Sequence, residues 1–145
     1  ECTEITGELV YHGKNVSMGY AECGSDLQKG DENHGILLTG DLAKRDSDNF
    51  YTIVGRKKRF IKLFGNRVNL DETERILKSI VSDCACTGED DHMKIYITDR
   101  TRIEEVLTFI SSKTGIHRSA FTIIQIEIIP KNPSGKTIYS NLGAL

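Results

Sequence analysis

The 145-residue chain has no tryptophan and only two prolines, five phenylalanines and five tyrosines, so its core must be mostly aliphatic. No apolar run approaches the ~20 residues that span a bilayer. The first residues also lack the basic and apolar regions of a signal peptide. The net charge of −2 gives no basis for nucleic-acid binding by bulk electrostatics. We therefore expect a soluble, cytoplasmic globular protein with neither a membrane nor a nucleic acid as partner.

The four cysteines form no recognisable metal-binding pattern. They lie at positions 2, 23, 84 and 86, and Cys84-Ala85-Cys86 is too close for a CxxC pair. We expect no metal site and free thiols in a reducing compartment, although an even number of cysteines leaves disulfides open. The chain begins with Glu1 rather than methionine, so we expect it to start inside a longer gene product.

Residues 1–57 read as a β-hairpin-rich segment. Residues 7–11 predict a short strand and residues 12–15 a turn, followed by a glycine-punctuated loop over 22–35. Two short apolar runs, 36–38 and 42–44, flank Thr39-Gly40-Asp41. The turn signal at 46–49 and the apolar run 50–54 then predict the return strand of a hairpin.

Residues 58–145 predict an α+β domain with a short antiparallel sheet flanked by helices. Its predicted elements are a hairpin of residues 60–64 and 67–70 around Gly65-Asn66, a helix over 72–80, a strand over 93–98, a helix from 103, and a strand over 121–129. Asp71 is the expected cap of the first helix, and Thr101 with Glu104 has the form of a capping box for the second. Gly115 is expected to end that helix. Ile124, Ile126 and Ile128 share one face of the last strand, which predicts a buried side.

Three short polar segments could carry chemistry. The Asp41 carboxylate could accept hydrogen bonds from two vicinal hydroxyls, as on a ribose, although a plain turn aspartate explains the segment better when it is taken alone. In the basic segment 55–62, Arg56 offers a fork of donors and Lys62 a mobile charge, but basic residues also protect sheet edges. Pro133-Ser134-Gly135-Lys136 presents a lysine on a tight loop that lacks the frame of a phosphate-binding P-loop. A polar loop near the C-terminus is the alternative there.

The order of these segments is that of a known family. G-E-[IL]-x-x-x-G occurs at 7–13 with Gly19-Tyr20, T-G-D at 39–41, G-R-x-K at 55–58, I-K-x-x-G-x-R-[IV] at 61–68, E-x-E at 72–74 and P-x-G-K at 133–136. The chain thus resembles the C-terminal portion of the adenylate-forming superfamily: acyl-CoA synthetases, carrier-protein-loading adenylation domains and luciferases. The resemblance implies that 1–57 ends a large N-terminal adenylation domain and that 58–145 is a mobile C-terminal lid.

The resemblance also implies roles for single residues. Asp41 would bind the ribose hydroxyls of ATP with Arg56 as its partner, and Lys58 would be the hinge of the lid. Lys62 would enter the site for thiol transfer, with Gly65 beside the pantetheine tunnel. Lys136 would act in adenylation. Lys62 and Lys136 are expected on different surfaces of the lid, so that one rotation exchanges them.

The activity so implied is an AMP-forming acid–thiol ligase. A carboxylic acid and ATP with Mg²⁺ form an acyl-adenylate and pyrophosphate, and the acyl group then passes to coenzyme A or to the phosphopantetheine of an acyl or peptidyl carrier protein. The phosphate loop, acyl pocket and Mg²⁺-binding glutamate of the family have no match in this sequence, so we expect the chain alone to be inactive. Arg67 with Leu70 looks closer to carrier-loading members, which leaves the acceptor open.

Two other interpretations stay open. The chain could be a non-catalytic α+β module that binds a carrier protein or another acidic partner, or a structural domain whose motifs are relics. Residues 1–57 would normally pair with strands that this sequence lacks, so their unpaired edges would favour a dimer or a strand swap.

Overall fold

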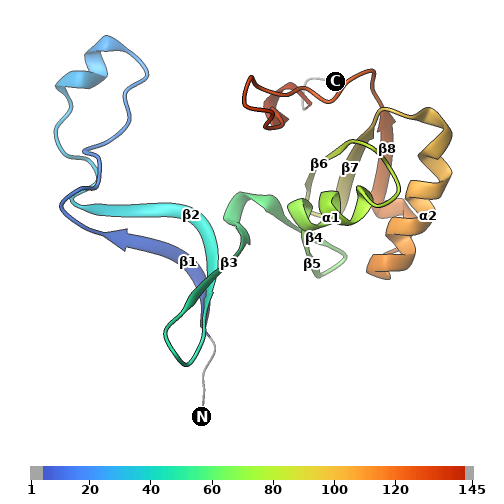
Figure 1. Ribbon diagram of the computed structural model, residues 1–145, viewed down its shortest axis with the longest axis horizontal. Coiled ribbons are helices and arrows are strands. Elements are labelled where there is room, and N and C mark those ends of the chain that lie inside the picture. The colour runs from blue at the N-terminus through green and yellow to red at the C-terminus, as the bar shows by residue number, and fades with distance from the viewer. Residues whose placement is uncertain (1–4, 143–145) are drawn as a thin grey trace. The chain divides into compact units, whose positions relative to one another are not determined.

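The computed structural model describes residues 5–142 and divides the chain into two compact units, 1–58 and 59–145, whose elements are labelled in Figure 1. The division lies one residue beyond the boundary predicted from the sequence. Cys2 lies outside the described residues, and Cys23, Cys84 and Cys86 are free thiols.

The first unit contains one antiparallel sheet with the order β1-β2-β3. Its strands are β1 (Ile5–His12), β2 (Ile36–Arg45) and β3 (Tyr51–Arg56), and a 3₁₀ helix over Gly24–Gln28 lies in the loop after β1. The predicted turn between β2 and β3 is present, and the Asp46 carboxylate accepts the N–H groups of Asp48 and Phe50 at 3.0 and 2.9 Å. The two predicted runs 36–38 and 42–44 are one continuous strand, because Gly40 adopts a φ of +74° and carries the chain through an irregularity in the β1 pairing.

The second unit opens with a hairpin of β4 (Phe60–Leu63) and β5 (Asn66–Asn69). Its turn residues are Phe64 and Gly65, with φ values of +48° and +83°, rather than the predicted Gly65-Asn66. A two-residue turn of this kind needs positive φ at both central positions, and the pairing of Leu63 with Asn66 fixes which two residues they are.

The remainder of this unit is a three-stranded sheet with two helices. The order along the chain is α1 (Leu70–Leu77), β6 (Cys84–Glu89), β7 (His92–Ile97), α2 (Ile103–Thr114) and β8 (Phe121–Gln125). The pairing of β6 with β7 is antiparallel, but β8 runs parallel to β7. The sheet is therefore mixed rather than purely antiparallel, because α2 forms a crossover between β7 and β8. The α+β class is confirmed.

Both predicted helix caps are wrong. The side chain of Asn69 caps α1 by accepting the N–H groups of Asp71 and Glu72, so the helix begins earlier than predicted and ends at Leu77. Before α2, Asp99 accepts both the N–H and the hydroxyl of Thr101 and forms a 3₁₀ turn over Arg100–Arg102. The predicted C-cap is confirmed, since Gly115 has a left-handed φ of +68° and donates to the Ser111 carbonyl.

The core of the second unit lies on both faces of the β6-β7-β8 sheet. Cys84 and Cys86 point into the cluster that α1 and α2 cover, whereas Ala85 points to the opposite face, where Tyr96, Ile129 and Leu142 are buried. The predicted strand 121–129 ends at Gln125. Ile124 and Ile126 pack on the second cluster as expected, but Ile128 is exposed, because the chain has left the sheet.

Candidate functional site

Asp41 and Arg56, both predicted to contact the ribose, lie opposite each other on β2 and β3. The Arg56 Nε is 3.5 Å from Asp41 Oδ1, and about two thirds of the Asp41 side chain is covered. Thr39 holds the backbone before Asp41 against β1. Its hydroxyl donates to the Leu9 carbonyl at 2.7 Å and accepts the Asp41 N–H at 3.1 Å. The Arg56 side chain is mostly exposed. A carboxylate and a guanidinium so placed can bind vicinal hydroxyls from one side.

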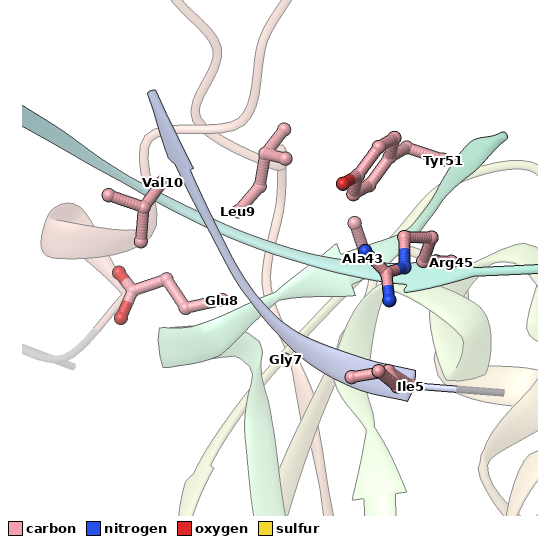
Figure 2. A pocket seen from close by; sticks show the side chains of 8 residues that line it. All are labelled: Ile5, Gly7, Glu8, Leu9, Val10, Ala43, Arg45 and Tyr51. Carbon is pink, nitrogen blue, oxygen red and sulfur yellow. The ribbon is translucent and has the colours of Figure 1, made fainter. Parts of the chain in front are cut away.

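The first unit also has an open hollow of about 530 Å³ on its sheet, shown in Figure 2. Its lining is largely apolar, with Leu9, Ala43 and Tyr51 beside the charged groups of Glu8 and Arg45. Neither Asp41 nor Arg56 lines it. The hollow is thus separate from the predicted nucleotide residues.

The predicted hinge and thiol-transfer residues lie in or near the β4–β5 hairpin. Lys58 is exposed in a 3₁₀ turn over Lys57–Arg59, where the first unit ends. The exposed Lys62 pairs across the hairpin with Arg67, whose guanidinium lies 4.2 Å from the centre of the Phe60 ring. Gly65 lies at the tip, and within residues 5–142 no atom outside the glycine and its two chain neighbours lies within 4 Å of the position that a Cβ would take.

The turn between β6 and β7 holds the backbone of this hairpin, which the sequence analysis missed. Asp90 Oδ1 accepts the Lys62 N–H at 2.9 Å, and the Asp91 N–H donates to the Lys62 carbonyl at 2.6 Å. The Asp91 carboxylate also accepts the Phe64 N–H at 2.7 Å. Two adjacent acidic residues between apolar strands are a turn signal that could have indicated this position.

Lys136 lies in a closed loop that Asn132 organises. The Asn132 side-chain oxygen accepts the N–H groups of Ser134 and Lys136 at 3.0 and 2.9 Å, and Gly135 adopts a φ of +77°. The Asn132 N–H in turn donates to the Lys136 carbonyl. The side chain of Lys136 is exposed, and among residues 5–142 it forms no ion pair. The sequence analysis also missed Asn132, although an asparagine before a proline favours the start of a turn.

A charged cluster in which the Arg59 and Glu74 side chains are largely covered lies beside the segment that follows this loop, and the sequence analysis did not anticipate it either. Arg59 donates to Asp71 at 2.7 Å, to Glu74 at 2.6 Å and to the Cys86 carbonyl at 2.8 Å. Its guanidinium lies 4.0 Å from the centre of the Tyr139 ring. Arg59, Asp71, Glu74 and Tyr139 are called the Arg59 cluster below.

The electrostatics keep Arg59 and Tyr139 protonated at neutral pH. Burial disfavours the charged form of Arg59, but the hydrogen bond to Asp71 and the charge of Glu74 outweigh it and raise its pKa. Burial raises the pKa of Tyr139 to about 12, and the Glu74 charge acts in the same direction. The arginine is therefore charged and the tyrosine hydroxyl is a donor.

The predicted residues thus fall into separate groups. Asp41 and Arg56 meet in the first unit, whereas Lys62, Gly65 and Lys136 belong to the second. Within the second unit, the β4–β5 hairpin and the red C-terminal segment lie apart from each other (Figure 1). No group of three or more His, Cys, Asp or Glu residues in 5–142 could hold a metal ion. None of the helices in that range is both long and apolar enough to cross a membrane.

Known proteins similar to this chain include CoA ligases and proteins solved with a bound adenylate. The chain is 31% identical over 152 residues to 4-coumarate–CoA ligase 1 of Glycine max. The aligned region covers 96% of the chain and 52% of that ligase. The anthranilate CoA ligase AuaEII, solved with anthranoyl-AMP, matches with a TM-score of 0.69 and 22% identity over 97% of the chain and 29% of its own length. McyG A-PCP, solved with phenylalanyl-adenylate, matches with a TM-score of 0.69 and 20% identity over 99% of the chain and 31% of its own length. No family model matches the chain.

By these similarities the chain resembles a C-terminal portion of adenylate-forming enzymes. It spans about half the length of the soybean ligase and less than a third of the two solved structures.

Proposed function

We propose that the chain supplies the C-terminal part of an AMP-forming acid–thiol ligase, which joins a carboxylic acid to ATP and transfers the acyl group to a pantetheine thiol. The observation that carries this proposal is the Lys136 loop. Asn132 holds an exposed lysine on a closed turn, in a chain that is similar to CoA ligases along nearly its whole length.

The first half-reaction needs a positioned cation. The oxygen of a carboxylate attacks the α-phosphorus of ATP, and the bond to the pyrophosphate oxygen breaks. Two anions must approach each other, so a fixed ammonium stabilises the transition state by several kcal/mol, on the order of an oxyanion-hole donor. Lys136 has the exposure and the ordered backbone for this role. Asp41 and Arg56 would hold the ribose of the same nucleotide, and the bound Mg²⁺ would neutralise phosphate charge.

The second half-reaction does not need that lysine. The thiol attacks the acyl carbon of the acyl-adenylate, AMP leaves, and the thiol proton passes to a base or to water. Lys62 lies on the hairpin beyond the hinge candidate Lys58. A rotation about Lys58 would replace Lys136 by Lys62 and exclude water in both closed states.

A chimera tests this proposal, because the chain alone is expected to be inactive. The 145 residues would replace the matching segment of a 4-coumarate–CoA ligase, and pyrophosphate exchange and thioester formation would be measured separately. Lys136→Ala should lower exchange by a factor of hundreds or more, at least ~3 kcal/mol of barrier. Lys113→Ala removes an exposed lysine from α2 and should leave exchange unchanged.

Lys62→Ala in the chimera should retain exchange and lose thioester formation. Equal exchange in the Lys136→Ala and unsubstituted chimeras would refute the proposed role. A chimera without any exchange would favour the binding module for a carrier protein or acidic partner. Acyl-AMP formation by the 145 residues alone would refute the expected inactivity. Comparing coenzyme A with a carrier protein as acceptor would then decide the partner.

A further inference from the structure

The loop that carries Lys136 is closed by backbone pairing of residues 130–131 with residues 137–138, and a side chain on each side of this pairing contacts the rest of the second unit. Lys131 pairs with Thr137 in an isolated bridge, and the Ile138 N–H donates to the Pro130 carbonyl at 2.8 Å. On one side, Lys131 reaches Asp83 at 2.5 Å. On the other side, Tyr139 enters the Arg59 cluster.

The two anchors differ in burial. The side chains of Lys131 and Asp83 are 40% and 27% exposed. Those of Arg59 and Glu74, which contact Tyr139, are 12% and 10% exposed, although Asp71 at the edge of the Arg59 cluster is 43% exposed. An exposed ion pair fixes a segment weakly, since water and salt screen it. A buried network fixes it strongly, because breaking one bond leaves a charged group without its partner.

Both carboxylate oxygens of Glu74 accept hydrogen bonds within this network. Its Oε1 accepts from Arg59 at 2.6 Å and from the Cys86 N–H at 2.7 Å, and its Oε2 accepts the Tyr139 hydroxyl at 3.0 Å. The carboxylate therefore joins α1, β6 and the C-terminal segment at one point. The Tyr139 ring, clamped between this hydrogen bond and the Arg59 guanidinium, has little freedom to move.

We propose that Tyr139, held by Arg59 and Glu74, is the positioning residue for the Lys136 loop. This inference rests on the function proposed for Lys136. Arg59 directly follows the hinge candidate Lys58 and is the first residue of the second unit. The Arg59 cluster thereby ties the start of this unit to the segment that carries the lysine. A rotation at Lys58 would carry the lysine loop as part of one rigid piece.

Hydrogen exchange on the 145-residue chain tests the positioning without any activity. Tyr139→Phe keeps the ring and removes only the hydroxyl that Glu74 accepts. The amides of Gly135, Lys136 and Ile138 should exchange at least about tenfold faster, as expected for one lost hydrogen bond to a charged group. The amides of β7 should not change. Ser111→Ala is the matched control, because it removes a hydroxyl bonded to the Ile116 carbonyl at 2.7 Å, at the end of α2.

Unchanged exchange in the loop would overturn the inference. If Tyr139→Phe also altered the β7 amides, Arg59→Lys would decide, since it keeps the charge but loses the fork of donors. Faster exchange confined to the loop in that variant would support the inference, and its absence would refute it.

The chimera separates positioning from general stability. Tyr139→Phe should lower the rate of pyrophosphate exchange at saturating ATP at least about tenfold and leave transfer from preformed acyl-adenylate unchanged. Equal loss in both half-reactions would show a structural role only and would refute the inference. If Lys136→Ala had no effect, the proposed function would fail. If only Lys136→Ala lowered exchange, the positioning role alone would fail.

Discussion

At the scale of single residues, the predictability of a contact depends on whether it lies within one hairpin. Asp41 and Arg56 could be predicted to lie near each other, because the turn at 46–49 brings their strands together, but an irregularity in the pairing between Leu42 and Ala43 decides that Arg56 rather than Gly55 lies opposite Asp41. Tyr139 and Glu74 could not, since 65 residues separate them and neither belongs to a local pattern. The role of Asn132 was predictable only in part. The Asn132-Pro133 dipeptide indicates a turn, but only the structure shows that the Asn132 side chain accepts the Lys136 N–H.

The buried thiols predict a loss of stability at alkaline pH. Burial first and the Glu74 charge second raise the pKa of Cys84 from 9.0 to about 11, and the pKa of Cys86 is raised by the same causes. Above pH 9 the unfolded chain releases these protons while the folded chain retains them. The stabilising contribution of Cys84 is thus complete below pH 9 and falls as the pH rises to about 11, and the raised pKa of Cys86 acts in the same direction. Urea unfolding at pH 8, 9, 10 and 11 measures this loss.

Cys84→Ala is the matching variant for this measurement. It should be less stable than the unsubstituted chain at pH 8, because it leaves a small cavity. Its free energy of unfolding should fall less steeply between pH 9 and 11, because one thiol no longer titrates in the unfolded state. The same slope in both proteins would refute the assignment.

At the scale of elements, patterns of one strand or one helix were predictable, and their junctions were not. The strand predicted over 93–98 and the end of α2 at Gly115 are confirmed within one residue. Caps and turns were harder to predict than strands and helices, because neighbouring polar residues compete for the same backbone groups. Asn69 and Asp99 do this before α1 and α2, ahead of Asp71 and Thr101. The parallel β8 depends on where the crossover packs, which periodicity does not encode.

Asn69→Ala should destabilise the second unit by about 1 kcal/mol, because two N–H groups of α1 lose their acceptor. Thr101→Ala should cost less, about 0.5 kcal/mol, since Asp99 still accepts the backbone N–H of residue 101. The free energies of unfolding in urea give both values. A larger loss of unfolding free energy in Thr101→Ala than in Asn69→Ala would support the capping box of Thr101 and Glu104 that was expected from the sequence.

The β6–β7 turn should affect the lysine of the hairpin selectively. Asp90→Ala removes the acceptor of the Lys62 N–H and leaves the Lys62 side chain intact. In the chimera, thioester formation should fall about tenfold, as expected for one lost hydrogen bond at a charged acceptor, while pyrophosphate exchange stays unchanged. Glu89→Ala removes a neighbouring exposed charge and is the control. An equal effect of both variants would show that charge rather than the hydrogen bond matters.

At the scale of the whole molecule, the first unit buries little of its apolar surface. Leu42 and Ala43 are its only buried hydrophobic residues within 5–58, whereas Leu38, Tyr51 and Ile53 are more than half exposed. With β1 and β3 at the edges of its sheet, we continue to predict a dimer through this unit. Sedimentation over a range of concentrations measures it. Ile53→Lys on the edge strand β3 should weaken the association, and a monomer at every concentration would refute it.

The second unit should fold without the first. Both buried clusters consist of residues between Ile61 and Leu142, and the Arg59 cluster is complete within residues 59–145. A fragment of residues 59–145 should therefore unfold in a single urea transition, whereas residues 1–58 alone should show none, because a sheet with two buried apolar side chains cannot offset its chain entropy. Leu63→Ala, at a fully buried position, should destabilise the fragment by about 2–5 kcal/mol and so show that its transition reports on this core. A fragment without a transition would mean that the second unit depends on the first.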